Sequence, residues 1–216
     1  MEPQWLDFAR RIQALAQTGL YYDTSPFDRE RYEKLLDIAA EMIAAYSDSD
    51  MPRVRGLFGT QDGHATPKVD VRGVVFHENK ILLVRENLDG GRWTLPGGWA
   101  DPGEAPGEAT TREVYEETGY RTRAVKLLAL YDHRLHGHGP HIFSIYKVFF
   151  RCELLDSHRS QAQIDNQSAS YIETGEVRFF AEDEIPADLS IGRVTPAQIR
   201  RFFEHLRQPD LPADFD

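Results

Sequence analysis

Three glutamates on one predicted helix constrain this chain more than any other feature. Glu113, Glu116 and Glu117 lie near the end of a helix expected over 106–118, which Gly119 should terminate in a left-handed conformation. With about 3.6 residues per turn, positions i, i+3 and i+4 share one helix face, so the three carboxylates are crowded. Their mutual repulsion and the negative end of the helix dipole both oppose this arrangement. A cation is therefore expected among them, and Mg²⁺ is the ion that carboxylates hold together with phosphates.

The residues around these glutamates follow a fixed spacing. The stretch from Gly98 to Tyr120 reads GWADPGEAPGEATTREVYEETGY. It resembles the Nudix box of the Nudix hydrolases, which runs Gly, five residues, Glu, seven residues, Arg-Glu-aliphatic-any-Glu-Glu-any-Gly-aliphatic. Every fixed residue is present, and the stretch departs from the pattern only at Tyr120, where the family prefers an aliphatic side chain. A match at so many spaced positions is far more specific than a lone glycine motif.

The resemblance implies a metal site built from the box. Glu113 and Glu117 correspond to the main metal ligands of the family, and Glu116 supplies a further ligand or orients a water molecule. Gly98 lacks a Cβ, so its backbone can approach a metal or a phosphate closely. The expected cofactor is Mg²⁺ or Mn²⁺.

Charged residues near the box have two kinds of predicted role. Arg112 is four residues before Glu116 and is expected to pair with a box carboxylate, while Glu104 is expected to pair with Arg112 and not with metal. Predicted strands near the box carry three further cations that could bind substrate phosphates or serve as structural charges: Arg72, Arg85 and Lys147.

The reaction implied by the resemblance is hydrolysis of a nucleoside diphosphate linked to another group. Water attacks one phosphorus and the second phosphate leaves, while metal ions neutralise the phosphate oxygens and lower the pKa of the water. Three glutamates are candidates for the general base. They are Glu116 in the box and Glu173 and Glu176 in the loop before the last predicted strand.

The first part of the chain has a different character. Apolar residues at helical spacing predict helices over 3–20 and 26–46, and either Ser25 or Asp28 can cap the second. A linker with one short strand is expected over 47–67. This hairpin resembles a Nudix subgroup with an N-terminal helical domain, which includes CDP-choline pyrophosphatases and proteins labelled ADP-ribose pyrophosphatases. Its apolar stripe must be covered, either by the rest of the chain or by the same hairpin of a second subunit, and a homodimer is expected.

Strands dominate the remainder. Apolar runs predict strands over 71–76, 81–84, 93–95, 122–132, 142–154 and 177–180, then a helix over 196–207 and a frayed tail after Gln208. With the resemblance, this order indicates an α+β protein: a Nudix α/β/α sandwich with a mixed sheet over 67–216, preceded by a helical domain over 1–66.

A loop over 133–141 holds four of the eight histidines. It lacks cysteine or carboxylate at a spacing that suits zinc, so it is interpreted as a solvated rim or as a group that grips the phosphate or base of a substrate. Some ADP-ribose hydrolases carry a proline about fifteen residues after the box. Here that position falls at Arg134-Leu135-His136 and the nearest proline is Pro140, which weakens the ADP-ribose interpretation.

Composition restricts the partners. The formal net charge is −10 and no cluster of five or more basic residues occurs, so duplex nucleic acid is not an expected partner. There is no apolar run long enough for a membrane span and no secretory signal, and one cysteine, Cys152, fits a reducing cytoplasm. Two alternatives stay open: a ligand-sensing regulator, which should show eroded glutamates, and an enzyme acting on RNA ends.

Overall fold

The computed structural model describes residues 2–23, 25–159 and 174–216 and divides the chain into two compact units. The helical unit comprises residues 1–68 with 139–144, and the sheet unit comprises 69–138 with 145–216. The domain boundary predicted between residues 66 and 67 stays a prediction.

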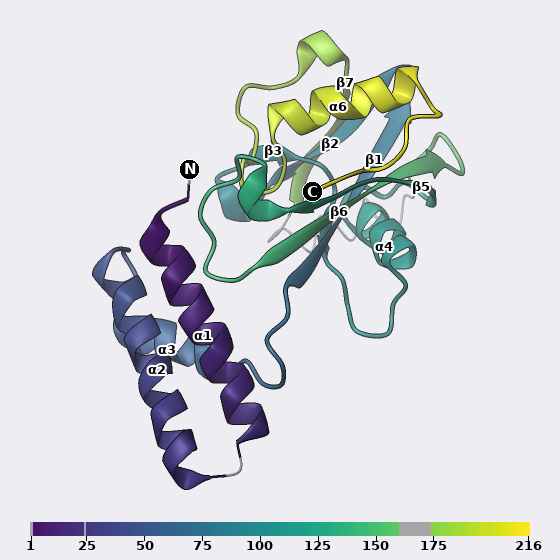
Figure 1. The fold of residues 1–216 in the computed structure, drawn as a ribbon. Helices are drawn as coiled ribbons and strands as arrows, with labels where there is room; N and C mark the ends of the chain where they lie inside the picture. The colour runs from purple at the N-terminus through teal and green to yellow at the C-terminus, as the bar shows by residue number, and fades with distance from the viewer. Residues whose placement is uncertain (1, 24, 160–173) are drawn as a thin grey trace. The chain divides into compact units, whose positions relative to one another are not determined.

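The helical unit consists of α1 (Gln4–Tyr22), α2 (Pro26–Ala45) and α3 (Met51–Gly59). The predicted start of α2 is confirmed, because the Ser25 side chain accepts a hydrogen bond from the Phe27 N–H at 3.3 Å. Small residues let α1 and α2 lie side by side (Figure 1), since Ala9, Ala16 and Ala39 are fully buried between them. No helix in the described part of the chain combines the length and the hydrophobicity that a membrane crossing requires.

Two predictions for this unit were wrong. The segment interpreted as a linker contains α3, which the Asp50 side chain caps by accepting from the Arg53 N–H at 2.8 Å. Val54 and Phe58, four residues apart, bury one face of this short helix. The first helix also runs past Gly19 to Tyr22, because the Tyr32 ring packs on the position that a Cβ at Gly19 would occupy.

The sheet unit is built on a mixed sheet with the strand order β3-β2-β1-β6-β5-β8, in which β4 also pairs with β1 and β7 with β2. Its strands are β1 (Lys68–His77), β2 (Lys80–Glu86), β3 (Arg92–Thr94), β4 (Gly97–Trp99), β5 (Thr122–Asp132), β6 (Ile145–Leu154), β7 (Thr174–Phe180) and β8 (Asp214–Phe215). The strands predicted over 71–76 and 81–84 are confirmed as β1 and β2, which form an antiparallel hairpin. Its two turn residues, Glu78 and Asn79, both have positive φ, as a tight hairpin turn requires.

Two helices cover the two faces of this sheet, α4 (Pro106–Thr118) and α6 (Pro196–Arg207), as Figure 1 shows. Side chains alternate accordingly: Val74 of β1 packs in the cluster with Phe202 of α6, and its neighbour Val75 packs with Val114 of α4. The predicted α+β sandwich is confirmed. Short 3₁₀ turns lie at Asn87–Asp89, His133–Leu135 and Glu182–Glu184.

The predicted frayed tail is instead attached to the sheet unit. Residues 214–215 form β8, which pairs in parallel with β5. Arg201 of α6 donates two hydrogen bonds to the carboxylate of Asp214, each at 2.7 Å, and His205 bonds to the same carboxylate at 3.0 Å. The hydrogen bonds of two α6 residues therefore hold Asp214 and the strand β8 in place.

Candidate active site

Two glycines bring the backbone of β4 against the acids of α4. Gly97 has φ +143°, and a Cβ there would lie 2.1 Å from the Val71 carbonyl oxygen of β1. The Gly97 N–H donates to Glu117 Oε2 at 3.0 Å. A Cβ at Gly98 would lie 2.9 Å from Glu113 Oε2, so the carboxylate packs directly on the glycine. A larger residue at position 97 would collide with the β1 backbone, and one at position 98 would force Glu113 away from the strand.

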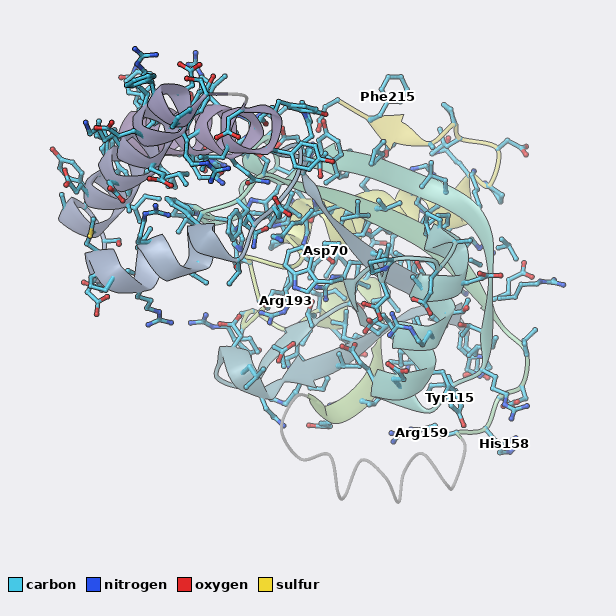
Figure 2. All side chains as sticks on the ribbon, turned by 90° about the horizontal axis from the view of Figure 1, so that it is seen from below. Asp70, Tyr115, His158, Arg159, Arg193 and Phe215 are labelled. Atoms are coloured by element: carbon cyan, nitrogen blue, oxygen red, sulfur yellow. The ribbon has the colours of Figure 1, made fainter. Side chains whose placement is uncertain are left out.

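The box helix is held in position at its end and along its length. Gly119 terminates α4 with φ +75° and donates to the Tyr115 carbonyl at 2.8 Å, which confirms the predicted left-handed cap. Arg159 Nε donates to the Thr118 carbonyl at 2.6 Å, and Figure 2 shows this arginine by the end of the helix. Underneath, Gly73 of β1 leaves the space that the Val114 side chain occupies.

Arg112 binds three of the box carboxylates at once. Its Nε and Nη2 donate to Glu104 at 2.9 Å, and its Nη1 donates to Glu113 at 2.9 Å and to Glu116 at 3.0 Å. The hydrogen bond from Arg112 lowers the pKa of Glu104. One guanidinium therefore orients Glu104 in the loop before α4 and both Glu113 and Glu116 on the helix.

Glu113 and Glu117 are partly buried, whereas Glu116 on the same face is exposed. Burial raises the pKa of Glu117 to about 8, against the opposing charge of Arg72, and burial also raises the pKa of Glu113. No set of three or more acidic, histidine or cysteine side chains converges on one ion position among the described residues. The donor chemistry nevertheless fits a hard divalent ion, because two desolvated carboxylates beside a glycine backbone are stabilised by positive charge.

A second buried cluster, Asp70–Arg72–Lys147, lies beside the box. Arg72 Nε donates to Asp70 Oδ1 at 2.6 Å, and Lys147 Nζ donates to Asp70 Oδ2. All three side chains are at most 7% exposed. Burial lowers the pKa of Lys147 to about 8 although Asp70 opposes this change. The cluster contains one more cation than anions and so presents positive charge to the box acids.

Two histidines of the loop over 133–141 line the same region and are not solvated, which corrects one interpretation of that loop. His133 and His138 are 4% and 9% exposed, and their rings stack at 4.8 Å. His138 Nδ1 lies 2.6 Å from the Ile191 carbonyl, and its Nε2 lies 3.1 Å from Gln198 Nε2. The carbonyl accepts from Nδ1–H and the amide donates to Nε2, so this is the neutral ring. Burial lowers the pKa of His138 to about 3.

Sequence analysis missed two charged residues of this site. Arg193, in the segment before α6, pairs with Glu86 at 3.3 Å and with Asp89 at 3.7 Å. The charge of Glu86 contributes to the raised pKa of Glu117. The charge of Asp70 raises the pKa of Lys147, whereas the charge of Arg193 lowers it. Figure 2 labels Asp70 and Arg193 in the middle of the sheet unit. Asp70 and Arg72 are two residues apart in an apolar strand, so they share one face, and this spacing could have indicated a role for Asp70. No comparable sequence pattern surrounds Arg193.

Other predicted site residues lie elsewhere or outside the description. Arg85 donates to the Gly91 carbonyl at 2.5 Å, stacks over Trp93, and pairs with Glu176 at 3.6 Å. These contacts join β2, β3 and β7 and involve no box residue. Glu176 is 57% exposed, and Glu173 lies outside the described residues.

Comparison with known proteins agrees with this geometry. Residues 3–58 match the family described as a UDP-X-like N-terminal oligomerisation domain, and residues 66–199 match the NUDIX domain. The Bacillus subtilis (strain 168) protein YjhB, provisionally named an ADP-ribose pyrophosphatase, is 43% identical over 100% of this chain and 99% of its own length. A crystal structure of a UDP-X diphosphatase is 33% identical and covers 98% of both chains with a TM-score of 0.59. An ADP-ribose pyrophosphatase from Streptococcus suis 89-1591 is 34% identical over 70% of this chain and 100% of that one, with a TM-score of 0.57.

Proposed function

The chain belongs to the Nudix hydrolase family, and on that premise we propose that it is a Mg²⁺-dependent pyrophosphohydrolase of nucleoside diphosphates linked to a second group. The products are a nucleoside monophosphate and a phosphorylated second group. The observation that carries the proposal is the packing of the partly buried Glu113 and Glu117 against the glycine backbone, with the pKa of Glu117 raised to about 8. Desolvated acids at this position are stabilised by a divalent ion.

The box residues divide into ion ligands and positioning residues. Glu113 and Glu117 would hold the ion, and Glu116 would join them or orient water. When bound, the ion neutralises phosphate oxygens and lowers the pKa of the attacking water. Arg112 fixes the rotamers of Glu113 and Glu116 through its two Nη1 hydrogen bonds.

Cations of the second cluster act on the diphosphate in different ways. Arg193 is 30% exposed, so its guanidinium can contact a phosphate directly. Arg72 and Lys147 are buried and paired, so they contribute by their charge and do not touch the substrate as the structure stands. Of the two roles predicted for these cations, this arrangement favours the structural charge over direct substrate contact.

The general base is one of the three glutamates named from the sequence. Glu116 is adjacent to the proposed ligands and 53% exposed, Glu176 pairs with Arg85, and Glu173 lies outside the described residues. Replacing each in turn by glutamine separates them, because only the base variant loses the acidic limb of the pH profile of kcat. Retention of that limb in all three variants would remove all three from the role.

The second group is best sought among uridine diphosphate derivatives. The UDP-X diphosphatase structure covers 98% of this chain, and the helical region matches a UDP-X-like domain. ADP-ribose follows from the names of two other relatives, and CDP-choline rests on the sequence resemblance alone.

A substrate panel tests whether uridine diphosphate derivatives are preferred over ADP-ribose and CDP-choline. UDP-sugars, ADP-ribose and CDP-choline are incubated with Mg²⁺ or Mn²⁺, and the products are separated by chromatography. We expect UMP release from at least one UDP derivative at the highest kcat/KM, with Glu117→Gln as the inactive control. Failure of every nucleoside diphosphate derivative to react would overturn the proposal, and preference for another nucleoside would correct only the substrate.

We also propose a homodimer formed through the helical unit and a cytoplasmic location. The match to an oligomerisation domain and the exposed apolar residues of α1 support the first. A single buried cysteine is consistent with the second.

A further inference from the structure

A polar cavity of about 280 Å³ lies in the helical unit, apart from the residues of the box. One wall is α1, which contributes Arg10, Gln13 and Gln17, and another is the segment over 61–68. Gln17 Nε2 donates to the Gly63 carbonyl at 3.1 Å and Ala65 N–H donates to Thr18 Oγ1 at 3.1 Å, so this segment is attached to α1. A water molecule takes about 30 Å³ in the liquid, so the cavity has room for several waters or for a hydrated oxyanion.

Arg10 is the unusual member of this lining. Its side chain is 6% exposed, yet no hydrogen-bond partner for its Nε or Nη1 occurs among the described residues. Its one ion pair joins Nη2 to Glu2. A guanidinium is a planar fork of donors that suits two oxygens of one ligand, and two unsatisfied buried donors carry a desolvation cost. Glu2 therefore holds one end of the guanidinium, and the Nε and Nη1 donors are left without a protein acceptor among the described residues.

The charge of the cavity has the sign that an anion requires. Lys68 is a second lining cation, and its Nζ donates to Gln61 at 3.1 Å and lies 5.0 Å from the Phe143 ring centre. The lining acid is Asp62, whose Oδ1 accepts from the Gly63 N–H. The lining itself holds these two cations and one acid in a chain whose net charge is −10, while Glu2, which pairs with Arg10, is not a lining residue. An excess of cations on a cavity lining attracts anions.

From these observations we infer that the cavity of the helical unit is a binding site for a phosphate-class oxyanion, held by the Nε and Nη1 donors of Arg10 and by the charge of Lys68. This site is separate from the proposed pyrophosphohydrolase centre and does not depend on it. Arg10 is the specific element, because bidentate Arg–phosphate pairs have fixed geometry, whereas Lys68 contributes as a point charge.

Thermal unfolding in the presence of inorganic phosphate tests the inference, with EDTA present and ionic strength held constant with chloride. Wild type is expected to gain Tm with phosphate in a saturable way, as a ligand of the folded state requires. Arg10→Met is expected to bind phosphate at least about tenfold more weakly, the scale of a lost charge-assisted hydrogen bond. Arg11→Met is the matched control: its side chain is 69% exposed on the next position of α1, and its phosphate response should equal that of wild type.

The behaviour without phosphate separates a ligand site from a packing role. Arg10→Met removes two unsatisfied donors but also the ion-pair partner of Glu2, so the two effects oppose each other and its Tm in phosphate-free buffer should stay close to that of wild type. Equal phosphate responses of Arg10→Met and wild type, or no response of wild type, would overturn the inference. Should Arg10→Met not fold, Lys68→Gln at the other wall replaces it, and an unchanged phosphate affinity in that variant counts equally against the site.

Discussion

At the scale of single residues, the box carboxylates are stabilised unequally by two positive charges, those of Arg112 and Arg72. Arg112 already binds Glu104, Glu113 and Glu116, whereas Glu117 receives a backbone N–H and the more distant charge of Arg72. Glu117 consequently bears most of the cost of burial, as its pKa of about 8 shows. An arriving divalent ion gains most from this carboxylate, because it relieves the largest desolvation penalty.

Glu117→Gln should therefore affect stability and activity in opposite directions. Because the pKa of Glu117 rises to about 8 on folding, its folded state binds the proton more tightly than the unfolded chain. This contribution to the free energy of unfolding is present at pH 4.5 and is lost as the pH rises towards 8. In EDTA, Glu117→Gln should lack that decline between pH 5 and 8, measured by thermal unfolding, while with Mg²⁺ its kcat should fall by about two orders of magnitude or more.

Glu108→Gln is the control for this prediction, since Glu108 is an exposed residue in the first turn of the same helix. It should keep both the pH dependence and the turnover of wild type. A Glu117→Gln variant with normal Mg²⁺-dependent turnover would contradict the ligand role.

His138 gives a second pH dependence with the opposite sign. It faces the Ile191 carbonyl, Gln198, the His133 ring and the charges of Lys147 and Asp70, and its pKa falls to about 3. In the unfolded chain the His138 side chain binds a proton as the pH falls below about 6.5, whereas in the folded protein it stays neutral until the pH approaches 3. The free energy of unfolding should therefore fall below pH 6.5, by about 1.4 kcal/mol per pH unit from this group, until the pH approaches 3.

His138→Asn should flatten the acid limb, measured by urea unfolding between pH 4 and 7. His158→Asn is the matched control, because His158 is exposed (Figure 2) and should leave the slope unchanged. Equal slopes in wild type and His138→Asn would show that His138 is not the titrating group.

Residues of the box were the easiest to assign from sequence, because fixed spacing on a helix determines which carboxylates share a face. The roles of Arg72 and Lys147 were harder to predict. The sequence pattern of a cation on a strand is the same whether its side chain contacts a phosphate or, as here, the buried Asp70. Arg193 could not be found at all. Its position depends on the loop before α6, which brings it to Glu86 across a long sequence separation.

At the scale of elements, the central packing contact is that of α4 on β1. A Cβ at Gly73 would lie 2.3 Å from Val114 Cγ2, in the cluster that also holds Val75 and Cys152. The absence of a side chain at Gly73 therefore determines how closely the box helix approaches the strand.

Gly73→Ala should destabilise the protein by about 1–3 kcal/mol, the usual cost of an overpacked core, and should lower kcat because the box helix moves away from Gly97 and Gly98. Thermal unfolding and turnover with Mg²⁺ measure the two effects. Gly56→Ala is the control: it lies within α3 with nothing near its Cβ position and should gain up to about 1 kcal/mol. Equal stability of Gly73→Ala and wild type would show that Val114 yields without strain.

Elements with strong periodicity were predicted well, and those that depend on tertiary contacts were not. α2, α4 and α6 carry long apolar stripes and clear caps. α3 has only nine residues. Asp50 and Pro52 mark its start, but the same two residues are also typical of the end of a preceding helix, which is how they were interpreted from the sequence. The strand Gly97–Trp99 exists only because β1 supplies hydrogen bonds to a Pro-Gly-Gly segment that has no strand propensity of its own.

At the scale of the whole molecule, the chain combines a sheet unit that carries the box with a helical unit whose outer surface is unusually apolar. Phe8, Leu15 and Tyr22 are 43%, 69% and 64% exposed. They are seven residues apart along α1, which is about two turns, so they form one stripe on a single face. Leu15 and Tyr22 also line a mostly apolar groove with Tyr32 and Leu35. An exposed stripe of this kind marks an interaction surface.

Substitution of Leu15 by glutamate tests whether a second copy of the chain covers this stripe. Wild type should have a mass twice that of the 24.7 kDa chain by light scattering coupled to size-exclusion chromatography. Leu15→Glu should shift that mass towards the monomer at micromolar concentration, because a buried unpaired carboxylate in an apolar interface is strongly unfavourable. Leu155→Glu is the matched control, since Leu155 is 61% exposed in the sheet unit and its substitution should leave the mass unchanged. A monomeric wild type, or a Leu15→Glu variant that keeps the full dimer mass, would show that the stripe is not the dimer contact.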